Sequence, residues 1–407
     1  MTVKTPIYLD HNATTSVDPR VLEAMMPYFT TRFGNAASRS HSFGWEAMDA
    51  VDRAREQIAR LIGAEVKEII FTSGATESDN IALKGVMENY QSKGNHLITA
   101  ATEHKAVLDT AKYLEKKGYA VSILPVQEDG RVDTDLLDAT ITKNTVLISL
   151  MLANNETGVL HPVHEIGKIA EKHDVLFHCD ATQAVGKVRI DVKEMGIHLM
   201  SMSGHKIYGP KGVGVLYVRS KSPKVNAAPV IHGGGHERGF RSGTLNVPGI
   251  VGMGAACELC GKEFDEEVPR LRGLRDKLEN GITGGLEHVY VNGHPTERLV
   301  STSNISFEWV EGEGIMLSMK EIAVSSGSAC TSASLEPSFV LHAMGRSDEL
   351  SHGSLRFSLG RWTTEDEIDY TVIRVIETVN RLREMSPLYE MSRKGVDLSK
   401  VEWNDEH

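Results

Sequence analysis

Short apolar runs alternate with amphipathic stretches between about residue 45 and residue 220. Residues 45–64, "WEAMDAVDRAREQIARLIGA", carry apolar side chains at helical spacing, which predicts a helix with one buried face. The members of this stripe are Val51, Ala54, Ile58, Leu61 and Ile62. The runs that predict strands are "EIIFTSG", "HLITAAT", "YAVSILPV", "TVLISLML", "VLFHCDA", "IHLMSMSG" and "GVLYVR". Such alternation is typical of an α/β fold with a doubly wound, mostly parallel sheet covered by helices on both faces.

The pattern changes after a long helical stretch that runs from about Pro248 towards Asn280. The later strands are predicted at "HVYVNG", "TSNISFEW", "EIAVSSGS" and "GSLRFSLG", with helices between them. We therefore predict a large domain over residues 16–260 and a smaller α+β domain from residues 1–15 plus 261–407. No internal repeat and no low-complexity linker interrupts this division.

Composition and charge restrict the function classes. No apolar run approaches the roughly 20 residues that a bilayer span requires, so a soluble protein with no membrane partner is expected. The start "MTVKTPIYLDHNATT" lacks a secretory signal, and we expect a cytoplasmic location. A net charge of -11 gives no electrostatic help to direct binding of nucleic acid.

The four cysteines are too few for a disulfide framework. "CELC" at 257–260 has redox or metal spacing, but structural thiols on one helix face are favoured because no second pair exists, and Cys179 is expected in the core. The loop "HGGGHERG" at 232–239 could hold a metal, although a turn-rich loop near a subunit contact is favoured. Asn12 and Asn155 each begin a glycosylation pattern that a cytoplasmic chain would not use.

Polar residues close several of the predicted strands, where ligands bind in parallel sheets. "FTSGATES" at 71–78 places Ala75 and Thr76 at a helix N-terminus, which predicts either a phosphate cradle or ordinary capping by Ser or Thr. Asp180, His104 and Asn155 follow three other strands, and Lys206 follows a fourth. A phosphate cradle, an acid, an imidazole and a lysine at one edge together suit pyridoxal phosphate.

The motifs "SGHKIYGPKG", "HCDATQ", "TEHKAV" and "SSGSACTSASLEP" resemble those of the cysteine desulfurases, most closely the housekeeping type that feeds iron-sulfur cluster assembly. The resemblance covers essentially the whole chain and implies a fold-type I pyridoxal-phosphate enzyme whose large domain binds the cofactor. It also implies conversion of L-cysteine to L-alanine, with sulfur left on the enzyme as a persulfide.

The resemblance assigns roles to individual residues. Lys206 would form the Schiff base, Asp180 would bind the pyridine nitrogen, and Gln183 would donate to the ring hydroxyl. His104 would stack on the ring and assist proton transfer. The residues that would hold the phosphate are Ala75, Thr76, Ser203 and His205, together with Thr244 from a second subunit of a homodimer.

The resemblance also implies which residues bind the substrate and which residue receives the sulfur. Asn155 would contact both the cofactor and the bound amino acid, and Arg356 would clamp the carboxylate of that amino acid. Cys330 would attack the substrate sulfur from a mobile loop, since its surroundings are small and polar. The persulfide would pass to a scaffold protein, docked by the tail "LSKVEWNDEH", and to other acceptors, with Cys330 as a transient ligand of a 2Fe-2S cluster.

Other functions remain open at this point. A selenocysteine lyase or an aminotransferase could share the fold, but an aminotransferase has no use for Cys330. A non-catalytic scaffold subunit would not need Lys206, Asp180 and Cys330 together. Release of alanine from cysteine without an added keto acid, and a visible absorbance that cysteine changes, would separate these possibilities.

Overall fold

The computed structural model describes residues 3–326 and 337–394. The chain forms two compact units. One, here called the sheet unit, comprises His11–Pro269 and Gly293–Val300, and the other, the terminal unit, comprises Met1–Asp10, Arg270–Asn292 and Ser301–His407. Their limits fall at 10/11 and 269/270, whereas the sequence-based division uses 15/16 and 260/261. The division into functional domains remains a prediction.

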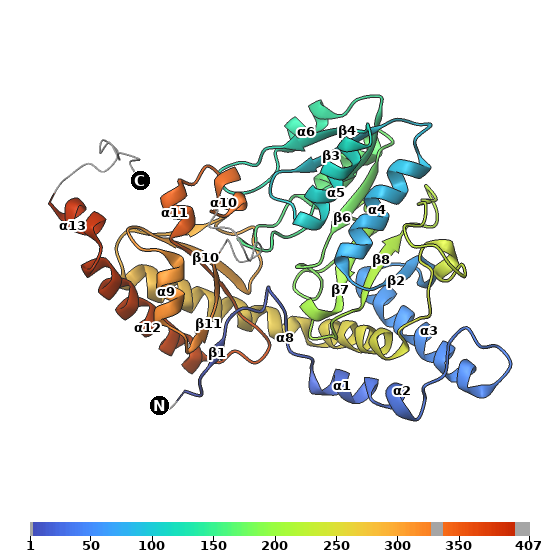
Figure 1. The fold of residues 1–407 in the computed structure, drawn as a ribbon, viewed down its shortest axis with the longest axis horizontal. Helices are drawn as coiled ribbons and strands as arrows, with labels where there is room; N and C mark the ends of the chain where they lie inside the picture. Colours follow the sequence, from blue (N-terminus) through green and yellow to red (C-terminus); the bar gives the residue numbers. More distant parts are fainter. Residues whose placement is uncertain (1–2, 327–336, 395–407) are drawn as a thin grey trace. The chain divides into compact units, whose positions relative to one another are not determined.

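The sheet unit is built on a seven-stranded sheet in the order β2-β8-β7-β6-β5-β3-β4 (Figure 1). Its strands are β2 (Ile69–Thr72), β3 (His96–Ala100), β4 (Ala120–Leu124), β5 (Thr145–Ser149), β6 (Leu176–Asp180), β7 (Leu199–Ser203) and β8 (Gly214–Val218). Strand β8 runs antiparallel to both of its neighbours, and the other pairs are parallel. The predicted α/β fold and each strand predicted between residues 45 and 220 are confirmed.

Helices separate these strands along the chain. They are α1 (Pro19–Met25), α2 (Pro27–Thr30), α3 (Ser42–Ile62), α4 (Ala75–Asn89), α5 (Lys105–Lys116), α6 (Thr134–Thr140) and α7 (Val163–Lys172). Short 3-10 turns are η1 (Val66–Glu68), η2 (Gly204–Lys206) and η3 (Glu237–Gly239). The long helix α8 (Val247–Gly285) begins in the sheet unit and continues past Pro269 into the terminal unit.

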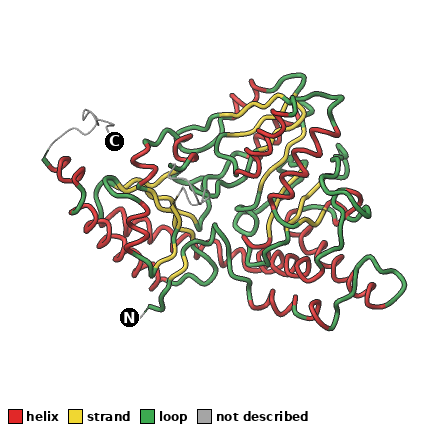
Figure 2. The backbone as a smooth tube through the Cα atoms, in the orientation of Figure 1, coloured by secondary structure: helices red, strands yellow, loops and turns green. Residues whose placement is uncertain are grey.

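Alternating strand residues form two cores, one on each face of the sheet. Phe71, Phe177 and Tyr217 are buried in one core with apolar residues of α3, α7 and α8. Leu97 and Leu216, from the opposite face, are buried with residues of α4 and α5. Because side chains alternate across a strand, this division confirms that helices cover both faces (Figure 2).

Helix α3 shows how the sequence pattern produces local structure. The imidazole of His41 accepts from the backbone N–H of Gly44 at 3.3 Å and caps the N-terminus, while Gly63 ends the helix with a φ of 69°. Four of the five predicted stripe residues are buried, and Leu61 is partly exposed. The apolar stripe of α3 therefore fixes which face packs on the sheet.

The terminal unit contains a four-stranded antiparallel sheet in the order β12-β13-β10-β9 and a parallel pair, β1-β11. The strands are β1 (Ile7–Tyr8), β9 (Val289–Asn292), β10 (Thr302–Phe307), β11 (Ile322–Ala323), β12 (Ser325–Ser326) and β13 (Ser354–Ser358). Its helices are α9 (Gly312–Ser318), α10 (Phe339–Ala343), α11 (Asp348–His352), α12 (Glu365–Glu384) and α13 (Pro387–Arg393). A reciprocal capping box between Thr364 and Glu367 begins α12.

The structure also tests the minor sequence features. Cys179, Cys257 and Cys260 are buried in the core, as predicted. Consecutive glycines at 233–235 have positive φ values, which confirms that "HGGGHERG" forms turns. Among the described residues, no helix is both long and apolar enough to cross a membrane.

Candidate active site

Several predicted site residues of the sheet unit lie where strands end. Asp180 and Ser203 are the last residues of β6 and β7, and Lys206 closes the turn η2 that follows β7. Ala75 is the first residue of α4, directly after β2, and His104 is the N-cap of α5, after β3. Their positions match the strand-end pattern seen in the sequence.

The Lys206 amine is held by backbone carbonyl groups from the start of the sheet unit. Nζ donates to the carbonyl oxygen of Asn12 at 2.5 Å and to that of Ala13 at 2.8 Å. Thr15 fixes the same turn, because its backbone N–H and its hydroxyl both donate to the His205 carbonyl at 2.9 Å. The Thr15 hydroxyl also accepts from the N–H of Tyr208 at 2.8 Å. Lys206 thus sits in a braced turn with its amine directed at neutral acceptors.

Asn12 brings three predicted residues together. Its carbonyl oxygen accepts from Lys206 and also from Gln183 Nε2 at 2.9 Å. Its side-chain amide donates to the carbonyl oxygen of Asn155 at 3.2 Å. Lys206, Gln183 and Asn155, from three different strand ends, therefore meet at one residue.

The N-terminus of α4 fits a phosphate group. Its N-cap is Gly74, and no side chain of the described chain caps it, so the alternative of capping by Ser or Thr is wrong. A Cβ placed on Gly74 would meet only Ser203 Oγ, at 3.9 Å, which leaves open space before the helix. A Cβ on Gly214 would lie 2.6 Å from the Gly74 Cα, so the two backbones approach closely. Uncapped backbone donors and a nearby hydroxyl are the groups that bind phosphate.

Asp180 is buried beside two further carboxyl groups. Its Oδ1 accepts from the backbone N–H of Thr182 at 2.9 Å. Burial raises the pKa of Asp79 well above its ordinary value, and the charge of Asp180 adds to this effect. Burial likewise raises the pKa of Glu103, although a hydrogen bond from the Met151 N–H opposes the shift. Asp79 and Glu103 thus favour their neutral forms beside Asp180.

A neutral imidazole lies in the same cluster. Burial lowers the pKa of His178 to about 4. Its ring nitrogens lie 2.9 Å from Ser149 Oγ and 3.0 Å from Ser201 Oγ, and Nε2 is 3.6 Å from Asp79 Oδ1. Because this histidine stays neutral near pH 7, it supplies no positive charge to balance Asp180.

The two predicted site histidines differ in their surroundings. Burial, with the charges of Lys206 and Lys211, lowers the pKa of His205 to about 4, and its Nδ1 lies 3.1 Å from Thr14 Oγ1. His104 Nδ1 accepts from the backbone N–H of Ala106 at 3.1 Å. A neutral His104 ring therefore carries its proton on Nε2 and can donate there.

Three further predicted residues are not found among the strand-end residues of the sheet unit that the structure describes. Thr244 is exposed, within a segment whose Arg241 pairs with Glu77 of α4 at 2.9 Å. Arg356 belongs to the terminal unit, where its Nη2 lies 2.7 Å from Asp10 Oδ1. Cys330 lies outside the described residues.

Sequence reasoning missed several contributors. One of them is Asn12, which the sequence marks only by a glycosylation-like pattern. In the structure, its backbone and side chain make structural hydrogen bonds instead. Asn154 holds the loop of Asn155, because its Oδ1 accepts from the N–H groups of Glu156 and Thr157 at 2.9 Å. Its amide donates to the Thr102 carbonyl at 3.0 Å, which ties this loop to the end of β3. Glu103 stands in the motif "TEHKAV" and Asp79 directly follows "FTSGATES", but neither pattern indicates that these acids are buried.

Comparison with known proteins places this chain in a family. The model of the aminotransferase class-V family matches residues 7–371. The chain therefore belongs to the aminotransferase class-V family.

Within the family, two similar full-length relatives carry the same name. "Cysteine desulfurase IscS" of Anaeromyxobacter sp. (strain Fw109-5) is 58% identical over 405 residues, 100% of both chains. That of Actinobacillus succinogenes is 57% identical over 404 residues, 99% of this chain and 100% of the relative. A solved "NIFS-LIKE PROTEIN" superposes with a TM-score of 0.86 at 38% identity, covering 92% of this chain and 99% of its own. "SspA in complex with cysteine" gives 0.78 at 37% identity, covering 88% and 100%. The resemblance to the housekeeping cysteine desulfurases is confirmed.

Proposed function

We propose that this chain is a pyridoxal-phosphate-dependent cysteine desulfurase that converts L-cysteine to L-alanine and forms a persulfide on Cys330. The observation that carries the proposal is the meeting of Lys206, Gln183 and Asn155 at Asn12. It occurs in a chain 58% identical over 405 residues to a protein named cysteine desulfurase IscS. A cysteine complex of a relative at 37% identity supports L-cysteine as the substrate.

Pyridoxal phosphate, when bound, supplies an aldehyde that reacts with amines and a ring that accepts electrons from the substrate. We assign Lys206 to the aldehyde, Asp180 to the pyridine nitrogen and Gln183 to the ring hydroxyl. The residues assigned to the phosphate are Ala75, Thr76, Ser203 and His205. The uncapped start of α4 and the adjacent Ser203 hydroxyl support this last assignment.

The remaining residues move protons and orient the substrate. Lys206 Nζ takes the proton from the α carbon, and His104 Nε2 donates a proton. Arg356 clamps the substrate carboxylate, aided by Asn155. The carbon–sulfur bond of cysteine breaks, a sulfur–sulfur bond forms to Cys330 Sγ, and a proton replaces sulfur on the methylene carbon. The electron pair of the carbon–sulfur bond stays with the methylene carbon, which is reduced as it takes up the proton, while the two sulfur atoms are oxidised to the persulfide level, so no external oxidant is needed.

The quaternary structure and partners are part of the same proposal. Thr244 is exposed, and the segment that carries it is tied to α4 by the Arg241–Glu77 ion pair. Thr244 would thus be available to the phosphate site of a second subunit in a homodimer. The persulfide would pass in the cytoplasm to an iron-sulfur scaffold, docked by the tail at 398–407, and to other acceptors, with a 2Fe-2S cluster transiently bound by Cys330. Both Cys330 and the tail lie outside the described residues.

The direct test follows sulfur and absorbance together. After addition of cysteine, mass spectrometry of the wild-type enzyme should find one extra sulfur on Cys330, with alanine released and no keto acid required. Cys330→Ser should keep the visible absorbance and lose the persulfide. Lys206→Ala should lose both the absorbance and alanine formation, whereas Lys211→Ala, an exposed lysine in the following loop, should keep them. Turnover by Cys330→Ser, or dependence on a keto acid, would instead favour an aminotransferase.

A further inference from the structure

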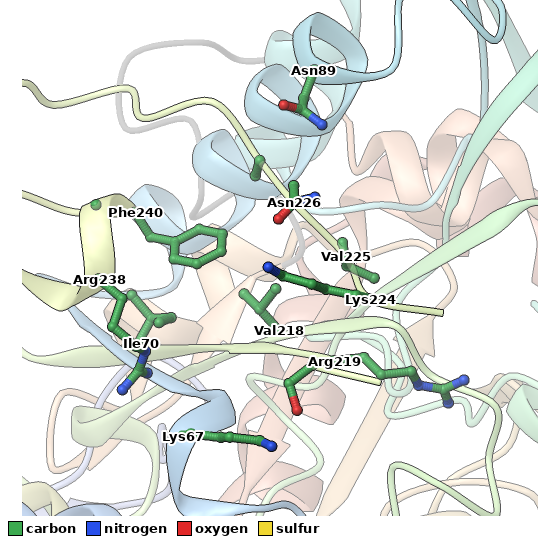
Figure 3. Close-up of a pocket in the computed structure, with 13 residues that line it drawn as sticks. Lys67, Ile70, Asn89, Val218, Arg219, Lys224, Val225, Asn226, Arg238 and Phe240 are labelled. Carbon is green, nitrogen blue, oxygen red and sulfur yellow. The ribbon is translucent and has the colours of Figure 1, made fainter. Parts of the chain in front are cut away.

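A second feature of the sheet unit is a cavity of about 470 Å³ that contains none of the proposed catalytic residues (Figure 3). It lies beside the end of β8, the start of β2 and the segment before η3. Lys67, Arg219, Lys224 and Arg238 line it, and none of the 13 described lining residues is acidic. Figure 3 shows the Lys224 amine and the Phe240 ring directed toward one another. The cavity is therefore basic, with an aromatic wall.

Arg238 lies beside a second guanidinium group, that of the buried Arg55. Arg55 Nη1 and Arg238 Nη2 each donate to the carbonyl oxygen of Ile69 at 2.6 Å. The nearby carboxylate of Glu237 uses both oxygens on Arg55, at 2.8 Å each, and one of them also accepts from the Phe71 N–H at 2.7 Å. Burial and the charge of Arg55 lower the pKa of Arg238 from its ordinary value, although the charges of Glu237 and Asp52 oppose this shift. Both oxygens of Glu237 are thus taken up by Arg55, and an anion in the cavity would add a direct partner for Arg238.

Two acids that neighbour the lining residue Lys67 in the sequence are already engaged. Glu68 Oε1 accepts from the Ser220 N–H at 2.8 Å and from its hydroxyl at 2.9 Å, and Oε2 accepts from the Glu65 N–H at 2.9 Å. Glu65 pairs with Lys67 at 3.0 Å and with Lys221 at 3.3 Å. No ion pair to Lys224, Arg219 or Arg238 occurs among residues 3–326 and 337–394. Three cations at the cavity therefore have no carboxylate within ion-pairing distance in the described part of the chain.

The backbone at Arg238 has an unusual conformation that neighbouring contacts hold in place. Glu237 and Arg238 have φ values of 47° and 56°, a left-handed conformation that non-glycine residues rarely adopt. The buried Arg55–Glu237 pair holds this turn in place. Strained backbone that is held by surrounding contacts is frequent at ligand-binding positions.

We propose that this cavity binds a small organic polyanion, with phosphate or carboxylate groups on Lys224 and Arg238 and a flat, apolar part against Phe240. Its volume falls in the range of small-molecule sites, about 300 to 1,000 Å³. Val218 and Val225 supply further apolar wall beside Phe240. This ligand site goes beyond the desulfurase function and does not rest on it.

Calorimetric titration of the full-length enzyme loaded with pyridoxal phosphate tests the proposal, with ADP, inorganic pyrophosphate and citrate as probes. Lys224→Gln should weaken binding of the responding probes at least about tenfold, the expected effect of losing a charged hydrogen bond. The matched control is Lys221→Gln, which removes the same charge three residues earlier in the chain. Lys221 does not line the cavity, and its side chain is 66% exposed. Both variants should keep desulfurase activity, since neither residue belongs to the proposed catalytic machinery.

The probes also identify the chemistry of the ligand. Binding of ADP and pyrophosphate without citrate would support a phosphate ligand, and binding of citrate alone would support a polycarboxylate. Equal affinities for wild type, Lys224→Gln and Lys221→Gln would overturn the proposal, as would no binding of any probe at millimolar concentration. A changed sedimentation coefficient of Lys224→Gln with unchanged probe binding would also overturn it, because Lys224 would then serve a subunit contact.

Discussion

The buried ion pair between Arg55 and Glu237 gives a quantitative test of how the sheet unit is held together. Both guanidinium Nη atoms donate to the carboxylate, and the two side chains are only 8% and 2% exposed. Glu237→Gln leaves the Arg55 charge buried without its counterion. Breaking one side of such a pair costs about 3 to 5 kcal/mol. Because the Arg55 guanidinium also lies 4.5 Å from the Phe71 ring centre, which the variant retains, we expect the lower part of that range, about 3 kcal/mol.

Urea unfolding followed by circular dichroism measures this loss. The double variant Arg55→Met with Glu237→Gln should recover part of it, because removal of both partners leaves no unpaired charge. The control is Arg189→Gln, whose partner Asp265 lies 2.5 Å away with side chains 68% and 82% exposed. An exposed pair contributes less than about 1 kcal/mol. A loss for Glu237→Gln no larger than that of Arg189→Gln would refute the reasoning.

Three further predictions concern packing and pH. Gly214→Ala should lower the free energy of unfolding by about 1 to 3 kcal/mol and reduce the cofactor absorbance that the purified protein retains, because the alanine Cβ would lie 2.6 Å from the Gly74 Cα. The control Gly273→Ala, whose Cβ would meet nothing within 4 Å, should change neither quantity. Burial raises the pKa of Asp79, so the native state keeps a proton that the unfolded chain loses, and stability falls as pH rises above the ordinary carboxyl pKa. Asp79→Asn should reduce this slope in unfolding experiments between about pH 5 and pH 8, with the part due to Glu103 remaining, and an unchanged slope would contradict the prediction. Burial lowers the pKa of His161 to about 4, so the neutral imidazole contributes up to about 3 kcal/mol to the stability of the native state. This contribution is complete above about pH 6.5 and is lost as the pH falls towards 4. The stability of His161→Gln should therefore be less sensitive to acid than that of the wild type in the same measurement.

The sequence predicted the sheet because the periodic signal there is strong. Every strand of the sheet unit is a short apolar run, and α3 carries a stripe long enough to show its buried face. Helix α6 (Thr134–Thr140) was not predicted, since it has only seven residues and Leu137 is its one buried residue. It depends instead on a cap, with Asp133 Oδ1 accepting from the N–H groups of Asp135 and Leu136 at 2.9 and 3.2 Å.

The site was predictable only in part, for a different reason. Lys206, Asp180 and Ser203 have side chains whose chemistry is visible in the sequence. The group that holds Lys206 is the backbone carbonyl of Asn12, 194 positions earlier, and a carbonyl has no residue-specific signature. The neutral state of Asp79 also follows from burial rather than from its identity, so no local pattern could predict it.

The distribution of charge in the sheet unit explains these separate contacts together. Asp79 and His178 are both shifted towards their neutral forms, so the cluster around Asp180 avoids accumulating several buried charges. The Lys206 amine, by contrast, is held by carbonyl oxygens of Asn12 and Ala13. A carbonyl accepts from a neutral amine as well as from an ammonium group, so these contacts persist when the amine gives up a proton. The N-terminal segment can therefore orient Lys206 in both protonation states that the proposed proton transfer would require.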